Sequence, residues 1–160
     1  FGVGDVIVPE QGKRKIPTQL ENFPAPTVNT YSLETTVAEK IDAILSLMEF
    51  SSRMKDYYDI YYLANKFDFD GTTLTEALKK TFENRGHSFT IEQFEQVMRF
   101  DNDEAMQKKW KAFKKKIDVK MEEFPFILQS INEFLCEPYT AVIKGTVFEK
   151  YWDANECSWN

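Results

Sequence analysis

Apolar residues recur at helical spacing along most of the chain, and the clearest case lies in residues 31–65. Ser32 is a predicted N-cap, and Glu34 lies in the first turn, where the helix dipole favours a negative charge. The pattern therefore predicts a helix that begins near Leu33, with Lys40 on the edge of its apolar face. At about 100° per residue, that face collects six side chains: Leu33, Val37, Ile41, Ile44, Leu45 and Met48.

A second helical segment follows and reaches Asn65. Large apolar side chains cover almost all of its faces, which is the pattern of a buried helix: Met54, Tyr57, Tyr58, Tyr61, Tyr62 and Leu63. Asp56 and Asp59 are three residues apart and share one face, while Lys55 precedes Asp59 by one turn and Arg53 stands at the helix start. Because a buried carboxylate requires a partner, we expect these aspartates to form ion pairs.

Four more helices are expected, over residues 74–85, 91–98, 106–117 and 124–135. Gly86 suits the end of the first of them. Thr90 and Gln93 form a capping box before the second. Pro138 is predicted to end the last helix. The segment after it is too apolar for a free end, so we expect it to fold back on the helices, with or without a short strand.

The expected fold class is mainly α (α+β), a bundle of about six helices with one or two N-terminal strands. The β propensity of the first nine residues predicts a strand there, and three prolines predict an irregular connection after it. An exposed strand edge at this end favours association, so a homodimer through it is a further prediction. The predicted divisions are a strand and Pro-rich connection, a helical domain and a packed tail: residues 1–30, 31–137 and 138–160.

Composition narrows the class of protein. The chain has 160 residues, 42% of them hydrophobic and 29% charged, as in a globular protein of one domain. No apolar run is long enough to span a bilayer, so we expect no membrane segment and a cytoplasmic location. Cys136, Cys157 and the single histidine, His87, are too few for a disulfide framework or a zinc site. His87 is expected in a surface loop. The net charge of -6 disfavours general nucleic-acid binding by the chain.

The two central segments resemble a known family. SLETTVAEKIDAI followed by SSRMKDYYDIYYLA is similar to the AbiEii-type nucleotidyltransferase-like toxins, in which a Leu/Val-Ala-Glu-Lys helix precedes an Arg-x-Lys-Asp-x-x-Asp helix. The segments GVGDVIVP and FDFDGTTLTEALKKTFENRG and the tryptophan-bearing end are also similar, so the resemblance covers most of the chain. It implies transfer of a nucleotidyl group from a nucleoside triphosphate with Mg²⁺, on a polymerase-β-like core. The expected helical bundle would then be the remnant of such a core.

The resemblance places the functional lysine of the family at Lys40 and its matching aspartate at Asp56. Lys40 would supply a cation to the triphosphate, while its stem stays buried. For Asp56 three roles stay open: it orients Lys40, it binds substrate through Arg53 or Lys55, or it assists proton removal. Asp59 is expected to anchor its helix by pairing with Lys55 or Arg53. A purely structural interpretation is that the whole cluster is a salt-bridge network that fixes two helices.

One part of the family pattern is missing. Members carry a Gly-Ser or Gly-Thr turn followed by Asp-x-Asp upstream of these helices, and the sequence has no such arrangement. We therefore expect a C-terminal portion of a bacterial toxin, of toxin-antitoxin or abortive-infection type, whose metal ligands precede Phe1. By itself this portion would be inactive and hold neither metal nor nucleotide. The acceptor of the whole protein would be RNA or a protein. The alternative is a non-catalytic helical module that docks an antitoxin or RNA.

Two other motifs have simpler interpretations. Asp68 and Asp70 form an Asp-x-Asp pair that can hold Mg²⁺, but they precede Thr73, a predicted helix cap, so a turn and cap is favoured. A basic run interleaved with Trp110 and Phe113 can bind RNA, but the rings at this spacing favour a buried face with solvated lysines opposite. The run contains six lysines: Lys108, Lys109, Lys111, Lys114, Lys115 and Lys116.

Overall fold

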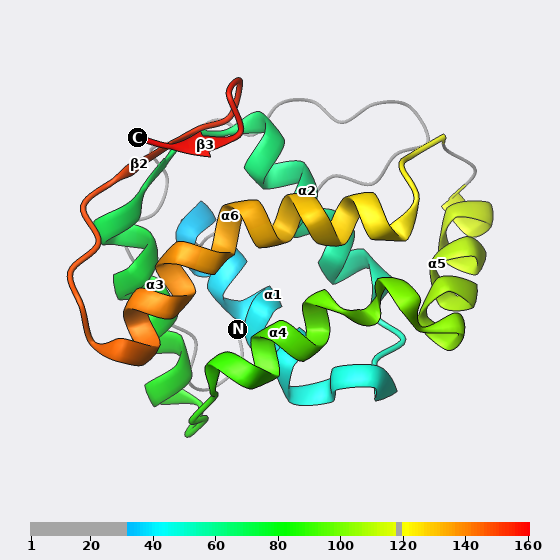
Figure 1. Ribbon diagram of the computed structural model, residues 1–160, viewed down its shortest axis with the longest axis horizontal. Coiled ribbons are helices and arrows are strands. Elements are labelled where there is room, and N and C mark those ends of the chain that lie inside the picture. The colour runs from blue at the N-terminus through cyan, green and yellow to red at the C-terminus, as the bar shows by residue number, and fades with distance from the viewer. Residues whose placement is uncertain (1–31, 118–119) are drawn as a thin grey trace.

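The computed structural model describes residues 32–117 and 120–160. Helices dominate this part of the chain (Figure 1), which confirms the mainly α class. The predicted N-terminal strands, and with them the proposed dimer edge, lie outside the described residues. The elements are α1 (Leu33–Leu47), η1 (Met48–Phe50), α2 (Met54–Lys66), β1 (Phe69–Asp70), α3 (Gly71–Asn84), α4 (Ile91–Met98), η2 (Phe100–Asn102), α5 (Glu104–Ile117), α6 (Phe124–Lys144), β2 (Tyr151–Asp153) and β3 (Ser158–Trp159).

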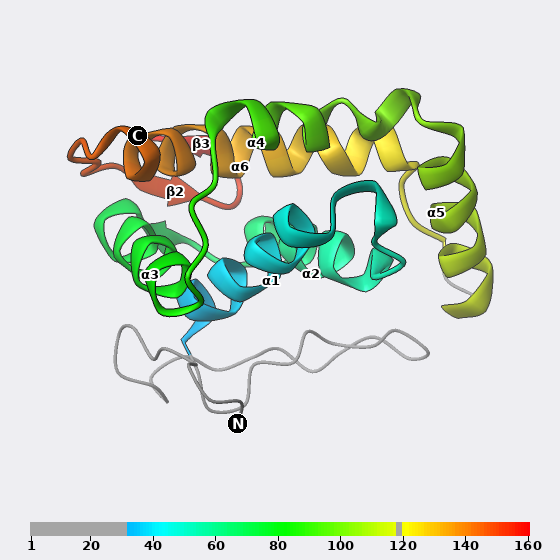
Figure 2. The same ribbon diagram turned by 90° about the horizontal axis from the view of Figure 1, so that it is seen from below.

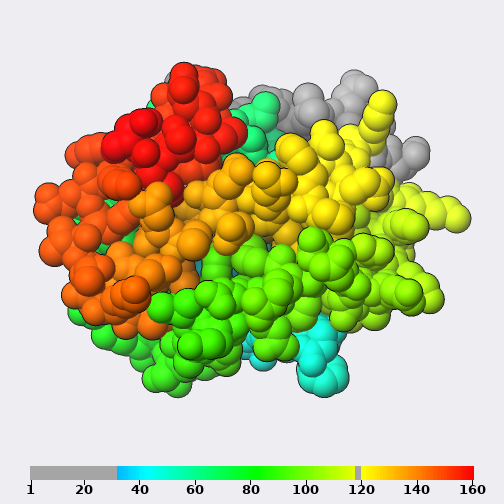
Figure 3. Space-filling model, in the orientation of Figure 1, coloured from blue at the N-terminus to red at the C-terminus, as the bar shows by residue number. Residues whose placement is uncertain are grey.

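The helices form two layers with the core between them. Figure 2 shows α4 and α6 side by side in one layer and α1, α2 and α3 in the other, while α5 stands at one end. The long helix α6 crosses the molecule, and Figure 3 shows it at the surface between the C-terminal segment and α4. Its other face is buried against both α2 and α3. The core therefore combines aliphatic side chains of α1 and α3 with rings of α2 and α6.

The starts of α1 and α2 are fixed by two serines. Ser32 is the N-cap of α1, as predicted, and its hydroxyl accepts a hydrogen bond from Thr35 N at 3.1 Å. Before α2, the hydroxyl of Ser51 accepts from Arg53 N at 3.1 Å. The turn between the helices is therefore ordered by its own polar groups, and it sets where the charged first turn of α2 lies.

Helix α3 begins earlier than predicted. Its N-cap is Asp70, whose carboxylate accepts from Thr72 N at 2.9 Å, so the prediction of Thr73 as cap was wrong. The start is fixed by Gly71, because a Cβ there would lie 2.6 Å from the carbonyl oxygen of Lys150. Asp68 accepts from Ala154 N at 2.9 Å. The Asp-x-Asp pair thus forms a turn and a cap, the interpretation favoured from the sequence.

Helix α6 continues through Pro138 to Lys144, so the prediction that Pro138 ends it was wrong. A proline has no N–H to donate to the carbonyl four residues before it, here that of Phe134. The indole of Trp159 supplies the missing donor, at 2.9 Å. The helix ends instead at Gly145, which has a left-handed φ of 70°.

The tail folds back on the helices, as predicted, and carries two of the three strands found among the described residues. The strand β2 lies between β1 and β3 and is antiparallel to both. Trp152 pairs with Phe69 on one side and with Trp159 on the other. Its buried indole donates to the carbonyl of Ala64, in α2, at 2.7 Å. The sheet therefore fastens the tail to both α2 and α6.

Candidate active site

The structure brings Lys40 together with both aspartates of α2. Its ammonium nitrogen lies 2.9 Å from Asp59 Oδ2 and 3.4 Å from Asp56 Oδ1. The Lys40 side chain is 15% exposed, that of Asp56 5% and that of Asp59 0%. These three groups, one from α1 and two from α2, form a nearly enclosed ion-pair cluster.

Two more cations stand at the outer side of this cluster. Arg53 Nε lies 3.0 Å from Asp56 Oδ2, and Lys55 Nζ lies 2.9 Å from Asp59 Oδ2. Their side chains are 59% and 37% exposed, respectively. Of the two partners predicted for Asp59, the structure therefore selects Lys55, whereas Arg53 pairs with Asp56. Three cations surround two carboxylates, so the cluster is positive when both carboxylates are ionised.

The local fold places these groups. Asp56 and Asp59 are one turn apart on the face of α2 that packs against α1, which puts both within reach of Lys40. The turn before α2 is held by Lys109 of α5, whose ammonium group donates to the carbonyls of Glu49 and Ser51, each at 2.9 Å. One lysine of the basic run is thus part of the support for the cluster.

The two oxygens of Asp56 differ. Oδ1 accepts a hydrogen bond from Lys40, whereas the buried Oδ2 is in ionic contact with Arg53 but accepts no hydrogen bond from a described residue. Burial raises the pKa of the Asp56 carboxyl, and this effect exceeds the lowering by Lys40 and Arg53. A carboxylate with a raised pKa and a free acceptor position is suited to take a proton.

The cluster fits a polyanion and does not fit a metal ion. Asp56 and Asp59 are already neutralised by Lys40, Arg53 and Lys55, so neither presents a free carboxylate to Mg²⁺. Residues 32–117 and 120–160 contain no group of three histidine, cysteine or acidic side chains that is arranged for a metal. The same three cations match the charge of a triphosphate.

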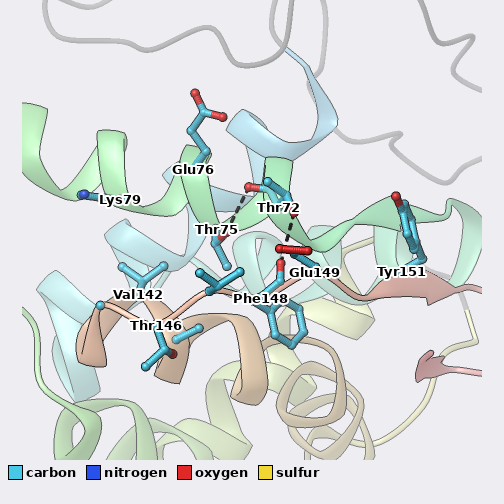
Figure 4. A pocket seen from close by; sticks show the side chains of 12 residues that line it. Thr72, Thr75, Glu76, Lys79, Val142, Thr146, Phe148, Glu149 and Tyr151 are labelled. Atoms are coloured by element: carbon cyan, nitrogen blue, oxygen red, sulfur yellow. Dashed lines mark hydrogen bonds between the residues drawn. The ribbon is translucent and has the colours of Figure 1, made fainter.

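A hollow of about 570 Å³, which was not predicted from the sequence, lies between α3, the end of α6 and the segment leading into β2. Thr72, Thr75 and Tyr151 border it (Figure 4). The hydroxyls are used within the protein, since Thr72 donates to Phe148 O at 3.3 Å and Thr75 to Gly71 O at 2.9 Å. None of the ion-pair cluster residues lines this hollow.

A further buried carboxylate, Asp42 of α1, was also missed. His87 Nδ1 lies 2.8 Å from Asp42 Oδ2, and Arg85 Nη1 lies 3.8 Å from Asp42 Oδ1. His87 does lie in a loop, between α3 and α4, but there it serves as partner to a buried acid. The available signal was the position of Asp42 directly after Ile41, beside the apolar stripe of its helix.

The aromatic residues of the basic run face inward, as the favoured interpretation requires. Trp110 is buried, and its indole donates to Glu122 O at 3.0 Å. Phe113 is partly buried against the core. Lys114 pairs with Glu123 at 2.7 Å. The rings are therefore not presented to bases. The exposed lysines of the run are Lys108, Lys111, Lys115 and Lys116.

Comparison with known families decides what kind of protein carries this cluster. A family model described as "Nucleotidyl transferase AbiEii toxin, Type IV TA system" matches residues 1–134. The chain belongs to the AbiEii family. The match covers α1 to α5 and the first half of α6, and thus the whole ion-pair cluster of this AbiEii protein. No curated protein and no solved structure matches the chain. Among the described helices none is long and apolar enough to cross a membrane.

Proposed function

We propose that this AbiEii protein transfers a nucleotidyl group from a nucleoside triphosphate to an RNA or protein acceptor in the cytoplasm, as the toxin of a toxin-antitoxin pair. The observation that carries the proposal is the position of Lys40, an ammonium group held between two buried carboxylates with two further cations outside it. Family membership supplies the reaction class, and the cluster supplies groups that suit it.

Nucleotidyl transfer depends mainly on positioning and on neutralisation of the triphosphate charge. Lys40 is the cation closest to the interior, so it would hold a phosphate group at a fixed place. Arg53 and Lys55 are more exposed and would meet the incoming nucleotide first. Mg²⁺, when bound, would polarise the transferred phosphate. Among the described residues no group of three His, Cys, Asp or Glu side chains is arranged to hold it.

Asp56 is proposed as the group that receives a proton from the acceptor hydroxyl. Its buried Oδ2 accepts no hydrogen bond from a described residue, and its raised pKa makes it a better base than an ordinary carboxylate. Arg53, beside this oxygen, would move to the phosphate as the nucleotide binds. Asp56 Oδ2 would then be released from its ion pair with Arg53, while Oδ1 keeps its contact with Lys40.

The test uses the full-length protein with labelled nucleoside triphosphates and Mg²⁺. Lys40→Ala and Asp56→Asn are each expected to lower transfer by about 100-fold or more, as for lost catalytic groups in other enzymes. Lys79→Ala, which removes an equal charge at the hollow beside α3, is the matched control and is expected to leave transfer intact. Full transfer by a folded Lys40→Ala variant would leave the cluster with a structural role only.

A second candidate function is docking without turnover, of an antitoxin or of RNA. The observation in its favour is the row of four exposed lysines on α5, in a chain of net charge -6. RNA affinity from such a row would fall steeply with salt, with a slope of roughly 0.7 per phosphate contact on single strands. Titration at two salt concentrations checks this, and salt-insensitive binding or none would exclude the RNA form. Capture of an antitoxin in the absence of nucleotide would favour the protein-docking form.

A further inference from the structure

Two ammonium groups meet at one carboxylate oxygen in the cluster. The nitrogens of Lys40 and Lys55 both lie 2.9 Å from Asp59 Oδ2, so they are separated by no more than twice that distance. Lys55 also donates to Asp59 Oδ1 at 3.0 Å. Lys40 belongs to α1 and Lys55 to α2, and a single oxygen thus joins cations from two helices.

This arrangement depends on the charge of Asp59. Two ammonium groups at such a separation repel each other, and the repulsion is strongest where water is excluded. The carboxylate of Asp59, whose side chain has no exposed surface, offsets the repulsion. Without that charge, Lys55 would lose its contact and extend into water, because it is long, flexible and more than one-third exposed.

We propose that Asp59 is a positioning residue that holds Lys40 and Lys55 together as a paired cation site for neighbouring phosphate groups of a nucleoside triphosphate. The proposal rests on the proposed function, since the triphosphate is the substrate named there. Lys40 and Lys55 each carry three N–H donors, and Asp59 would hold both ammonium groups where a bound triphosphate can reach them. Asp59 and Asp56 then have different tasks, because Asp59 arranges the cations and Asp56 takes the proton.

A positioning role for Asp59 and a purely electrostatic role predict opposite changes in triphosphate affinity when Asp59 is replaced. Asp59→Asn removes a negative charge beside a site for a polyanion. If charge alone mattered, the variant would bind a triphosphate more tightly. If Asp59 positions the two lysines, the variant binds it more weakly, despite the more positive cluster. The direction of the change therefore separates the two explanations.

The experiment measures nucleotide binding to the full-length protein by calorimetry, with each ribonucleoside triphosphate and Mg²⁺, and with tripolyphosphate as a probe of phosphate recognition. Asp59→Asn is expected to weaken binding about tenfold or more, as for lost hydrogen bonds to charged groups. In the transfer assay it should raise KM more than it lowers kcat, whereas Asp56→Asn should mainly lower kcat. Glu149→Gln, an exposed change of the same charge, should change neither constant.

Lys55→Gln keeps the proposal falsifiable if Asp59→Asn fails to fold, because Lys55 lies at the outer side of the cluster. It should also weaken binding about tenfold, and Lys55→Arg should recover part of the loss. Unchanged or tighter triphosphate binding by Asp59→Asn, or unchanged binding by Lys55→Gln, would overturn this inference and leave the proposed function intact. A wild-type protein that binds no triphosphate would overturn the proposed function itself.

Discussion

The indole of Trp159 replaces a hydrogen-bond donor that Pro138 removes from α6. Trp159 Nε1 lies 2.9 Å from the carbonyl oxygen of Phe134, the group that residue 138 would serve in an unbroken helix. The rings of Phe134 and Trp159 are also parallel, with centroids 5.9 Å apart. A proline inside a helix and a tryptophan in the last strand thus form one unit.

The first prediction concerns this unit. Trp159→Phe keeps a ring but leaves the Phe134 carbonyl without a donor, which should cost about 1–3 kcal/mol of unfolding free energy. In a Pro138→Ala background the helix supplies its own N–H, so Trp159→Phe should cost less there. Urea unfolding of wild type, the two single variants and the double variant measures the coupling energy between the two residues, which we expect to be on the order of 1 kcal/mol. Equal costs in both backgrounds would show that the two residues act independently.

The second prediction concerns the stability of the ion-pair cluster. Lys40→Ala leaves Asp56 and Asp59 buried with fewer partners, and breaking a buried pair in this way should cost about 3–5 kcal/mol. Arg53→Ala is the comparison, since its more exposed pair should contribute less than about 1 kcal/mol. Thermal unfolding measures both. Equal melting temperatures for wild type and Lys40→Ala would contradict the account of a buried cluster.

The third prediction is a pH dependence from Asp56. Burial raises its pKa above the usual 3.8, so folding favours the protonated carboxyl. The resulting stabilisation is complete below the unfolded-state pKa and is lost as the pH rises through the folded-state pKa. Asp56→Asn cannot titrate, so the stability of wild type relative to this variant should fall from about pH 4 upwards. Parallel stability curves for the two proteins would exclude a raised pKa.

The fourth prediction compares two glycines. At Gly71 a Cβ would lie 2.6 Å from Lys150 O and from a ring carbon of Phe148, so Gly71→Ala should cost at least about 1–3 kcal/mol. At Gly86 there is open space, and only the positive φ of 71° opposes a side chain, so Gly86→Ala should cost about 1 kcal/mol. Only Gly71→Ala should change tryptophan fluorescence, because it displaces the segment that leads to Trp152. If Gly71→Ala and Gly86→Ala changed stability and fluorescence equally, the close approach of Gly71 to Lys150 and Phe148 would be refuted.

Much of the candidate site was predictable because its determinants are local. The 3.6-residue period placed Lys40 at the edge of the α1 stripe, and the spacing of Asp56 and Asp59 placed both on one face of α2. The pairing of these groups across two helices then followed from the need to neutralise buried charge. What the sequence left open was the choice of partners, since Arg53 and Lys55 are within reach of either aspartate.

The errors arose where distant segments override local rules. Pro138 normally marks a helix end, but here Trp159, in another element, supplies the donor that it removes. Thr73 has the sequence of a cap, but the close approach of Lys150 O favours a start at Gly71. Pairing of Phe69 with Trp152 joins strands of two or three residues, and strands this short leave no periodic signal.

The central position of β2 in the sheet has a consequence for biosynthesis. Phe69 and the Ala64 carbonyl find their partner in Trp152, which the ribosome adds long after α2 and α3. Until then Phe69 and the Ala64 carbonyl lack the partner that they have in the folded protein. The toxin would mature only after translation has passed the last two tryptophans.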